Sequence, residues 1–409
     1  MNPPTLNVAM MTSGGLAPCL SSSIASLVSS YAELGQPITL RFYHSGYKGI
    51  LTGTSTYFAT VPSTGFDALH AFGGSPLGSS RVKLTNVADC LKRGYIKGAE
   101  TPLSVAAAQL KVDNVDVLHT IGGDDTNTQA AELSFFLKEQ GYGLTVVGMP
   151  KTIDNDVYPI AQTFGAETAA EEGAKFFSRV VSEGSSSPRM LIIHECMGRD
   201  SGFLTARSAF LYRESLKANN SFAQLPALPA LSFGTRDVHA VYIPENHLDI
   251  DEEGARLKKV MDEFDVVNVF LSEGAGVEDI VKEMERKGEE VPRDAFGHIV
   301  LAKINPGAYL SDRLGKLVGA EKVLVQKSGY FARAAPSNDF DKELIQRCAL
   351  EGAKSAIARV SGCMGEDENK GGEVRAIEFE RIKGGKPFDV KQAWFVGMMS
   401  EVSVYGGAK

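Results

Sequence analysis

Two segments of this chain combine glycines with hydroxyl or carboxylate side chains in a way that suits phosphate binding. The first, TSGG at residues 12–15, offers backbone N–H groups that could hold a phosphate at the start of a helix. The second, IGGDD at residues 121–125, places Asp124 and Asp125 directly after two glycines. One carboxylate at a helix start can be an ordinary cap. Two suggest a divalent cation, since Mg²⁺ prefers one or two carboxylates together with phosphate oxygens.

A third segment, PKTIDND at residues 150–156, carries groups that suit phosphoryl transfer. Asp154 can accept the proton of an attacking hydroxyl, and Asp156 can help to hold a metal ion. Lys151 can neutralise charge on the phosphoryl group during its transfer. A loop shaped by Asx turns is the alternative for this segment alone. The IGGDD segment favours the catalytic interpretation.

Other residues are suited to a sugar phosphate. Arg199 follows Gly198 in MGR at residues 197–199, and a guanidinium group matches phosphate oxygens with two parallel hydrogen bonds. Glu245 could bind sugar hydroxyls. The segment KSGYFAR at residues 327–333 offers two cations and a phenol. Taken alone, Glu245 and residues 327–333 are more typical of an ordinary protein surface.

The apolar pattern predicts the elements that must position these segments. Short β-branched runs alternate with longer amphipathic stretches, which indicates mainly parallel sheets covered by helices. Ligands bind at the carboxyl ends of such strands, and TSGG, IGGDD, PKTIDND and MGR all follow predicted strands. The predicted strands are residues 7–11, 115–121, 144–148, 190–194, 240–243 and 266–271.

Composition excludes several classes of protein. The chain has 409 residues, 43% hydrophobic and 22% charged, as in a globular protein of more than one domain. A net charge of −8 without a basic run argues against a nucleic-acid partner. No apolar stretch reaches the roughly 18 to 20 residues that span a bilayer, and the N-terminal residues do not resemble a secretory signal. Five scattered cysteines without a CxxC pair indicate reduced thiols. We therefore expect a cytoplasmic protein without a membrane partner.

We place a boundary between two lobes at residue 150, giving lobes of residues 1–150 and 151–409, and we expect the chain to cross between the lobes again. Residues 362–372 (GCMGEDENKGG) are polar and charged, so we expect an exposed hairpin or mobile loop there. The chain contains neither the P-loop pattern GxxxxGK[ST] nor the dinucleotide fingerprint GxGxxG after its first strand.

In order and spacing, TSGG, GGDD, PKTIDND and MGR resemble the phosphofructokinase family over roughly residues 5–335. The resemblance implies two Rossmann-like α/β lobes with mainly parallel sheets and an active site in the cleft between them. The N-terminal lobe would lie on the phosphoryl-donor side and the C-terminal lobe on the sugar-phosphate side. It also implies transfer of a phosphoryl group to the 1-hydroxyl of fructose 6-phosphate, with Mg²⁺, in a homodimer or higher homo-oligomer.

Carried over position by position, the resemblance gives each motif a role. The residues that would bind the donor are Gly14, Gly15 and Arg81. Asp124 would hold the metal. The catalytic residues would be Asp154 as general base, Lys151, Asp125 and Asp156. The residues that would bind the sugar phosphate are Thr152, Ile153, Asp154, Met197, Gly198, Arg199, Glu245, Lys327, Tyr330, Phe331, Ala332 and Arg333.

Two positions depart from the pattern of the ATP-using members, which typically have glycine where this chain has Asp125 and Lys151. A carboxylate at position 125 would oppose the α-phosphate of ATP by bulk and by like charge, and Lys151 would add a cation for pyrophosphate. The pair resembles the pyrophosphate-dependent branch of the family. We therefore expect reversible transfer between pyrophosphate and fructose 6-phosphate, in glycolysis or gluconeogenesis, that yields phosphate and fructose 1,6-bisphosphate.

Two alternatives remain at this point. One is an ATP-dependent 6-phosphofructokinase of the same fold, against which Asp125 and Lys151 argue. The other, from a different class, is a non-catalytic regulatory subunit that binds sugar phosphates. Loss of Asp124 or Asp154 would favour that alternative, and both residues are present.

Overall fold

The computed structural model of the protein describes residues 3–219, 228–293 and 301–407. The chain divides into two compact units, and each is formed by two separate segments. The first unit comprises Met1–Thr168 and Arg333–Lys386, and so contains the whole of residues 1–150. The second unit comprises Ala169–Ala332 and Pro387–Lys409. The chain therefore returns to the first unit and then to the second before it ends.

A seven-stranded sheet forms the centre of the first unit, in the order β11-β10-β5-β4-β1-β2-β3. The five strands from β10 to β2 are parallel, and the edge strands β11 and β3 are antiparallel to their neighbours. The strands are β1 (Leu6–Thr12), β2 (Ile38–Tyr43), β3 (Ser55–Phe58), β4 (Val117–Gly122), β5 (Thr145–Pro150), β10 (Gly362–Asp367) and β11 (Glu373–Ile377).

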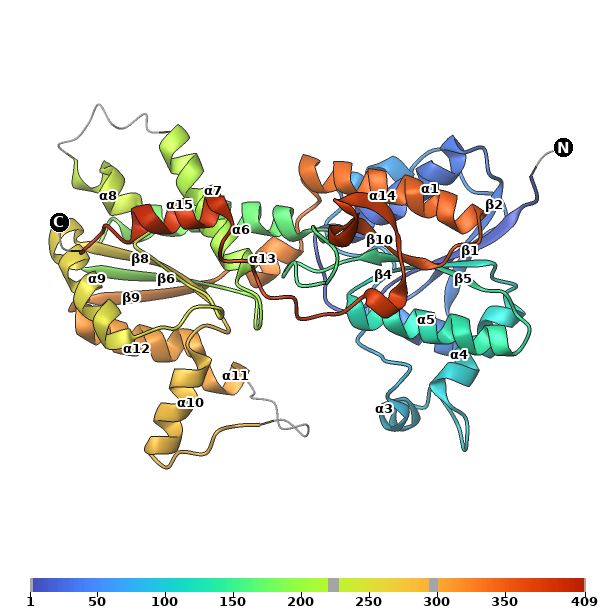
Figure 1. Ribbon diagram of the computed structural model, residues 1–409, viewed down its shortest axis with the longest axis horizontal. Coiled ribbons are helices and arrows are strands. Elements are labelled where there is room, and N and C mark those ends of the chain that lie inside the picture. Colours follow the sequence, from blue (N-terminus) through green and yellow to red (C-terminus); the bar gives the residue numbers. More distant parts are fainter. Residues whose placement is uncertain (1–2, 220–227, 294–300, 408–409) are drawn as a thin grey trace. The chain divides into compact units, whose positions relative to one another are not determined.

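Helices cover both faces of this sheet, which explains why β4 and β5 are buried at every position. In Figure 1, α1 and α14 lie over one face, and α4 and α5 lie over the other. The α-helices are α1 (Leu20–Glu33), α2 (Tyr47–Thr52), α3 (Val87–Lys92), α4 (Pro102–Val112), α5 (Asp124–Glu139) and α14 (Asp339–Ile357). The 3₁₀ helices are η1 (Phe66–Ala71), η4 (Glu368–Lys370) and η5 (Phe379–Arg381).

The hairpin predicted at residues 362–372 forms, but it is exposed only around its turn. Its first strand, β10, pairs with β5 inside the sheet and is almost wholly buried. Cys363 and Met364 fill the core at 0% exposure. Buried Asp367 accepts hydrogen bonds from Arg375 at 3.0 Å and Arg381 at 2.8 Å. The expectation of exposure is confirmed for residues 368–372 and wrong for residues 362–367, where apolar side chains face the core and ion pairs neutralise the charge of Asp367.

The second unit contains a four-stranded, fully parallel sheet in the order β7-β8-β6-β9. Its strands are β6 (Met190–Cys196), β7 (Ala240–Tyr242), β8 (Val266–Ser272) and β9 (Lys322–Lys327). Leu257 of α9 and Leu310 of α12 belong to the core on one face. Phe177 of α6 and Tyr212 of α7 pack with Phe270 of β8 on the other.

The remaining helices lie largely in the second unit, where α10 and α11 stand away from its sheet (Figure 1). They are α6 (Ala166–Gly184), α7 (Phe203–Ala218), η3 (Pro229–Leu231), α8 (Phe233–Arg236), α9 (Ile250–Phe264), α10 (Val277–Arg286), α11 (Leu301–Ile304), α12 (Pro306–Val318), α13 (Gly329–Arg333) and α15 (Ala393–Val402). Within the described parts of the chain, no helix has both the length and the apolar character needed to cross a membrane. The α/β class with mainly parallel sheets is confirmed, and all six predicted strands form.

Candidate active site

The two glycine-rich turns of the first unit meet at a switch point of its sheet. Neighbouring strands β1 and β4 continue toward opposite edges, β1 to β2 and β4 to β5. In open α/β sheets, ligands bind at the carboxyl ends of the strands at such a point. The backbone N–H of Ser13 donates to the carbonyl of Ile121 at 3.0 Å, which ties the TSGG turn to the end of β4. TSGG and IGGDD therefore lie at the carboxyl ends of β1 and β4, the part of this sheet that most favours ligand binding.

Residues 73–81, which end at the predicted donor-binding residue Arg81 and are called the donor-side loop below, are fastened to the TSGG turn. Gly14 N–H donates to the carbonyl of Ser80 at 2.9 Å, and the Ser79 hydroxyl donates to the Gly14 carbonyl at 2.7 Å. The Thr12 hydroxyl donates to the carbonyl of Gly78 at 2.7 Å. Gly14 has a φ of 86°, a left-handed conformation that glycine adopts without strain. These hydrogen bonds hold the donor-side loop and the TSGG turn against each other.

Three cations gather around the two glycines of this turn. A Cβ atom at Gly14 would lie 3.4 Å from Lys151 Nζ. A Cβ atom at Gly15 would lie 3.6 Å from Arg333 Nη1 and 3.9 Å from Arg81 Nη2. Glycine thus leaves the space beside all three cations open. A cluster of this kind suits a compact polyanion.

Lys151 is buried, with only 6% of its surface exposed. Burial lowers the pKa of its ammonium group, and the nearby cations Arg333 and Arg81 lower it further. The carboxylate of Asp154 acts in the opposite direction and raises the pKa of Lys151. The cation therefore stands in a confined environment, where its effect on a bound anion is stronger than in open water.

The loop after β5 holds the predicted catalytic acids in a defined arrangement. Asp154 N–H donates to the Thr152 hydroxyl at 3.1 Å, and that hydroxyl donates to Asp156 Oδ1 at 3.2 Å. Asn155 takes a φ of 51°, which asparagine tolerates better than most residues. Ile153 is 6% exposed, so its side chain belongs to the core. Asp154 and Asp156 are half-buried.

The carboxylates at the start of α5 have different surroundings. Asp124 is half-buried, and within the described residues its hydrogen bonds involve only its backbone. Asp125 is exposed, and its carboxylate accepts a hydrogen bond from Lys83 Nζ. No cluster of three or more metal-ligating side chains occurs in the described residues. A half-buried Asp124 carboxylate without a protein donor fits Mg²⁺ bound jointly with phosphate oxygens.

One segment near these acids was missed in the sequence. The backbone of Gly384 packs directly against the Asp124 carboxylate, and Lys386 N–H donates to the Asp156 carbonyl at 2.8 Å. The two adjacent glycines of KGGK at residues 383–386 were the only signal there. Nothing in their spacing links them to Asp124.

In the second unit, the MGR segment and Glu273 lie at the ends of neighbouring strands β6 and β8. Glu273 N–H donates to the Cys196 carbonyl at 3.0 Å, and the Ser272 hydroxyl donates to the Gly198 carbonyl. Burial raises the pKa of Glu273 above its ordinary value, although the charges of Arg199 and Lys327 act in the opposite direction. The sequence alone had indicated no role for Glu273. A carboxylate and glycine directly after a predicted strand was the available signal.

Lys327 and the exposed helix α13 lie beside the MGR segment. The Lys327 ammonium donates to Glu195 Oε1 at 2.6 Å. A Cβ atom at Gly329 would lie 3.0 Å from Met197 Sδ. Tyr330 and Phe331 are exposed, and Ala332 is buried. Arg199 is exposed as well.

Glu245 has a structural use within the second unit. Its carboxylate accepts hydrogen bonds from Gly202 N–H at 2.9 Å and from Phe388 N–H at 2.8 Å. These contacts hold the start of α7 and the segment before α15. A contact between Glu245 and sugar hydroxyls stays a prediction.

The predicted residues are thus divided between the two units. The first unit carries Gly14, Gly15, Arg81, Asp124, Asp125, Lys151, Thr152, Ile153, Asp154, Asp156 and Arg333. The second carries Met197, Gly198, Arg199, Glu245, Lys327, Tyr330, Phe331 and Ala332. Arg333, predicted on the sugar phosphate, lies by the donor glycine Gly15.

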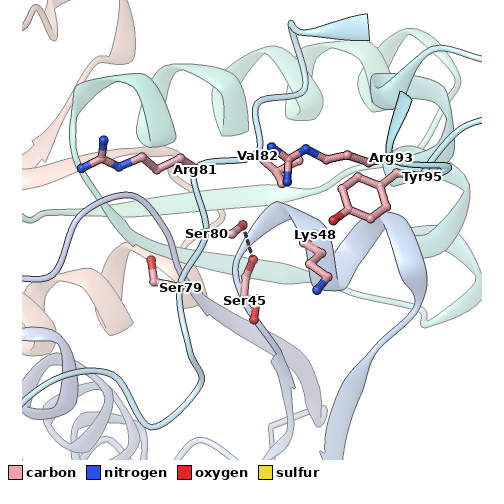
Figure 2. Close-up of a pocket in the computed structure, with 8 residues that line it drawn as sticks. All are labelled: Ser45, Lys48, Ser79, Ser80, Arg81, Val82, Arg93 and Tyr95. Carbon is pink, nitrogen blue, oxygen red and sulfur yellow. Dashed lines mark hydrogen bonds between the residues drawn. The ribbon is translucent and has the colours of Figure 1, made fainter. Parts of the chain in front are cut away.

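A cavity of about 220 Å³ adjoins the donor-side loop. Figure 2 shows Lys48, Arg93 and Tyr95 around it, while the Arg81 side chain points away from Lys48 and Tyr95. The Arg81 guanidinium instead lies near Gly15. The cavity is therefore a neighbour of the three-cation cluster and not the space that this cluster surrounds.

Comparisons with known proteins agree with this fold and with the family that the sequence motifs resemble. Residues 7–351 match the phosphofructokinase family. A pyrophosphate–fructose 6-phosphate 1-phosphotransferase of Methylotuvimicrobium alcaliphilum is 53% identical over 100% of this chain and 99% of its own. One of Propionibacterium freudenreichii is 50% identical over 97% of both chains. The crystal structure of a pyrophosphate-dependent phosphofructokinase from Nitrosospira multiformis has the same fold, with a TM-score of 0.69 at 16% identity, covering 96% of this chain and 91% of its own. The chain belongs to the phosphofructokinase family.

Proposed function

We propose that this chain transfers a phosphoryl group reversibly from pyrophosphate to the 1-hydroxyl of fructose 6-phosphate, yielding phosphate and fructose 1,6-bisphosphate. The observation that carries the proposal is the cluster of Lys151, Arg81 and Arg333 around Gly14 and Gly15. Pyrophosphate is a compact polyanion that such a cluster suits. The two relatives that are 53% and 50% identical to this chain carry names that support the same activity.

The residues of the first unit act on the donor and on the attacking hydroxyl. Gly14 and Gly15 leave room for pyrophosphate beside Lys151, whose positive charge stabilises negative charge on the transferring group. Asp154 accepts the proton of the sugar 1-hydroxyl as general base. Thr152 orients this loop through its bonds to Asp154 and Asp156. Asp124, and Asp156 through water, would hold Mg²⁺, which supplies positive charge to the phosphate oxygens.

The residues of the second unit act on the sugar phosphate. Arg199 and Lys327 are cations at the ends of β6 and β9 and bind phosphate oxygens. Glu273 lies beside them and accepts hydrogen bonds from sugar hydroxyls. Half-buried Met197, buried Gly198 and exposed Tyr330 surround these cations, with Phe331 and Ala332 following in α13. Glu245 supports this region because its carboxylate accepts hydrogen bonds from the backbone N–H groups of Gly202 and Phe388.

Pyrophosphate is proposed over ATP because of Asp125 and Lys151. The Asp125 side chain adds bulk and charge directly after Asp124, where the α-phosphate of a nucleotide would lie. The presence of Asp124, Asp154 and Lys151 in the sequence argues against the alternative of a non-catalytic subunit. We also propose a cytoplasmic homodimer or higher homo-oligomer. The five free, buried cysteines are consistent with a reducing compartment.

Donor exchange tests this function. Formation of fructose 1,6-bisphosphate is measured with Mg²⁺ and either pyrophosphate or ATP, and its phosphorolysis is measured with inorganic phosphate. We expect activity with pyrophosphate, a measurable reverse reaction and little activity with ATP. Activity with ATP alone would favour the ATP-dependent alternative. Binding of fructose 6-phosphate without turnover would favour a regulatory subunit. Light scattering after size exclusion measures the oligomeric state.

A further inference from the structure

The segment Lys383–Lys386 is fixed at both ends beside the loop that carries Asp154 and Asp156. Lys383 exchanges two backbone hydrogen bonds with Tyr158, at 2.8 Å and 3.0 Å. At the other end, Lys386 N–H donates to the Asp156 carbonyl at 2.8 Å. The Lys386 ammonium also donates to the Ile160 carbonyl at 2.6 Å. The two residues between these anchors therefore have little freedom to move.

The two glycines between the anchors are required for different reasons. Gly385 has a φ of 77°, a left-handed conformation, and a Cβ atom added there would meet nothing within 4 Å. The φ of Gly384 lies outside the left-handed region, so its backbone would accept alanine. A Cβ atom at Gly384 would instead overlap Asp124 Oδ2 and lie 2.7 Å from Asp124 Cγ. Gly384 is therefore needed for space beside Asp124.

The backbone of Gly384 contacts the Asp124 carboxylate, whose orientation must be fixed by neighbouring groups. Within the described residues, no hydrogen bond or ion pair fixes the Asp124 side chain. Its orientation is set by its own rotamer and by the backbone surface of Gly384. A short carboxylate displaced by a Cβ atom must rotate or push the anchored segment away. Either movement would change where its oxygens point.

We propose that Gly384 is a positioning residue for the magnesium site: its missing side chain lets the anchored Lys383–Lys386 segment pack against Asp124 and holds the carboxylate oriented for the metal. The inference rests on the proposed function only in assigning the metal to Asp124. It gives a role to a part of the chain that follows the region matched by the family.

Mn²⁺ serves as a probe because its free aqueous form has an EPR signal that disappears on binding. The full-length protein is titrated with Mn²⁺ in the presence and absence of pyrophosphate. Gly384→Ala should raise the dissociation constant of Mn²⁺ about tenfold, in the range found when residues around metal ligands are changed. Gly385→Ala is the matched control, since it strains the same segment without reaching Asp124. It should change the constant much less.

The Asp124→Ala background isolates the contact. There, Gly384→Ala should cause no further loss of Mn²⁺ affinity, because the clash with the carboxylate no longer exists. Lys386→Ala loosens the segment without adding an atom beside Asp124 and should weaken Mn²⁺ binding by a smaller factor. Circular dichroism and the melting temperature check that each variant folds. If Gly384→Ala does not fold, Lys386→Ala carries the test.

Several outcomes would overturn this role for Gly384. They are wild-type affinity in Gly384→Ala, an equal loss in Gly385→Ala, or an additional loss of the same size in the Asp124→Ala background. Equal Mn²⁺ binding by wild type and Asp124→Ala would remove the metal assignment on which it rests. Inactivity with pyrophosphate in a wild-type protein that binds Mn²⁺ through Asp124 would contradict the proposed donor and leave the positioning role intact.

Discussion

The ammonium group of Lys83 donates a hydrogen bond to the carboxylate of Asp125. Lys83 lies two residues beyond Arg81, and Asp125 directly follows Asp124, so this ion pair joins the donor-side segment to the start of α5. The side chains of Lys83 and Asp125 are 48% and 62% exposed to solvent, and such pairs contribute little to stability. The pair provides Asp125 with a counter-ion. Bulk therefore has a larger share in any exclusion of ATP than the sequence alone suggested.

Asp154 is expected to act on the proton of the sugar hydroxyl. Asp154→Asn keeps the size of the side chain and removes the base, so kcat should fall by about 10²- to 10⁴-fold. The KM for fructose 6-phosphate should change much less, because the phosphate contacts remain. Steady-state kinetics with saturating pyrophosphate measures both constants. A variant with near-normal kcat would remove Asp154 from the mechanism.

Asp124 is expected to bind the metal. Asp124→Ala should raise the Mg²⁺ concentration needed for half-maximal activity and lower kcat, because the ion loses its protein carboxylate. The measurement is the initial rate as a function of free Mg²⁺ at fixed pyrophosphate. Unchanged Mg²⁺ dependence would show that the carboxylate acts only as a favourable charge at the start of α5.

Arg199 and Arg333 should differ in their effects, because they belong to different surroundings. Arg199→Ala should mainly raise the KM for fructose 6-phosphate. Loss of a hydrogen bond to a charged group costs about 1.5–3 kcal/mol, or roughly a 10- to 100-fold rise in KM. Arg333 lies by Gly15, so Arg333→Ala should raise the KM for pyrophosphate as well. If Arg199→Ala raised only the KM for pyrophosphate, the assignment of donor and sugar residues would be reversed.

Burial predicts a pH effect at Lys151. Its pKa is lowered mainly by burial, and the neutral amine forms as pH rises through that value. If the cation stabilises the transferring phosphoryl group, kcat/KM for pyrophosphate should fall on the alkaline side at a lower pH than an ordinary lysine would give. Lys151→Arg keeps its charge and should move this alkaline limb to higher pH. An unchanged pH profile in Lys151→Arg would assign the limb to another group.

Continuous apolar runs made the central strands predictable. Strand β4 (VLHTIG) is buried at every position, and such an apolar run directly before two glycines has few alternatives. Strand β9 (KVLVQK) begins and ends with lysine and is largely exposed at the sheet edge. Strand β10 contains two glycines and two acids. Their places in the sheets follow from pairing with β6 and β5, which local sequence does not contain.

The location of a candidate site residue was predictable where its motif directly follows a strand, because the end of that strand alone then fixes where the motif lies. This holds for Gly14, Asp124 and Lys151. Contacts between distant segments were not predictable. The Gly384 backbone lies on Asp124, and Glu245 is held by backbone N–H groups from two segments. Both depend on packing that brings residues together without a local pattern.

Donor choice can be tested by returning each departing position to glycine. Asp125→Gly removes bulk and charge beside the donor site and should let ATP bind, at least weakly. Lys151→Gly removes a stabilising cation and relieves no block, so pyrophosphate activity should fall with no gain for ATP. The double change should admit ATP more fully than either single change and remain poor with pyrophosphate. The measurement is kcat/KM for both donors.

Lys83→Ala separates bulk from charge at the same position. It leaves the Asp125 carboxylate in place and removes its counter-ion, so like-charge repulsion should increase while the bulk of residue 125 stays constant. If charge is important, Lys83→Ala should bind ATP more weakly than wild type, and its KM for pyrophosphate should rise. If bulk dominates, Lys83→Ala should bind ATP as weakly as wild type does. Asp125→Gly should then bind ATP, whereas Asp125→Asn should not. Should wild type already prefer ATP, or Asp125→Gly show no detectable ATP binding, this account of donor choice through residue 125 is wrong.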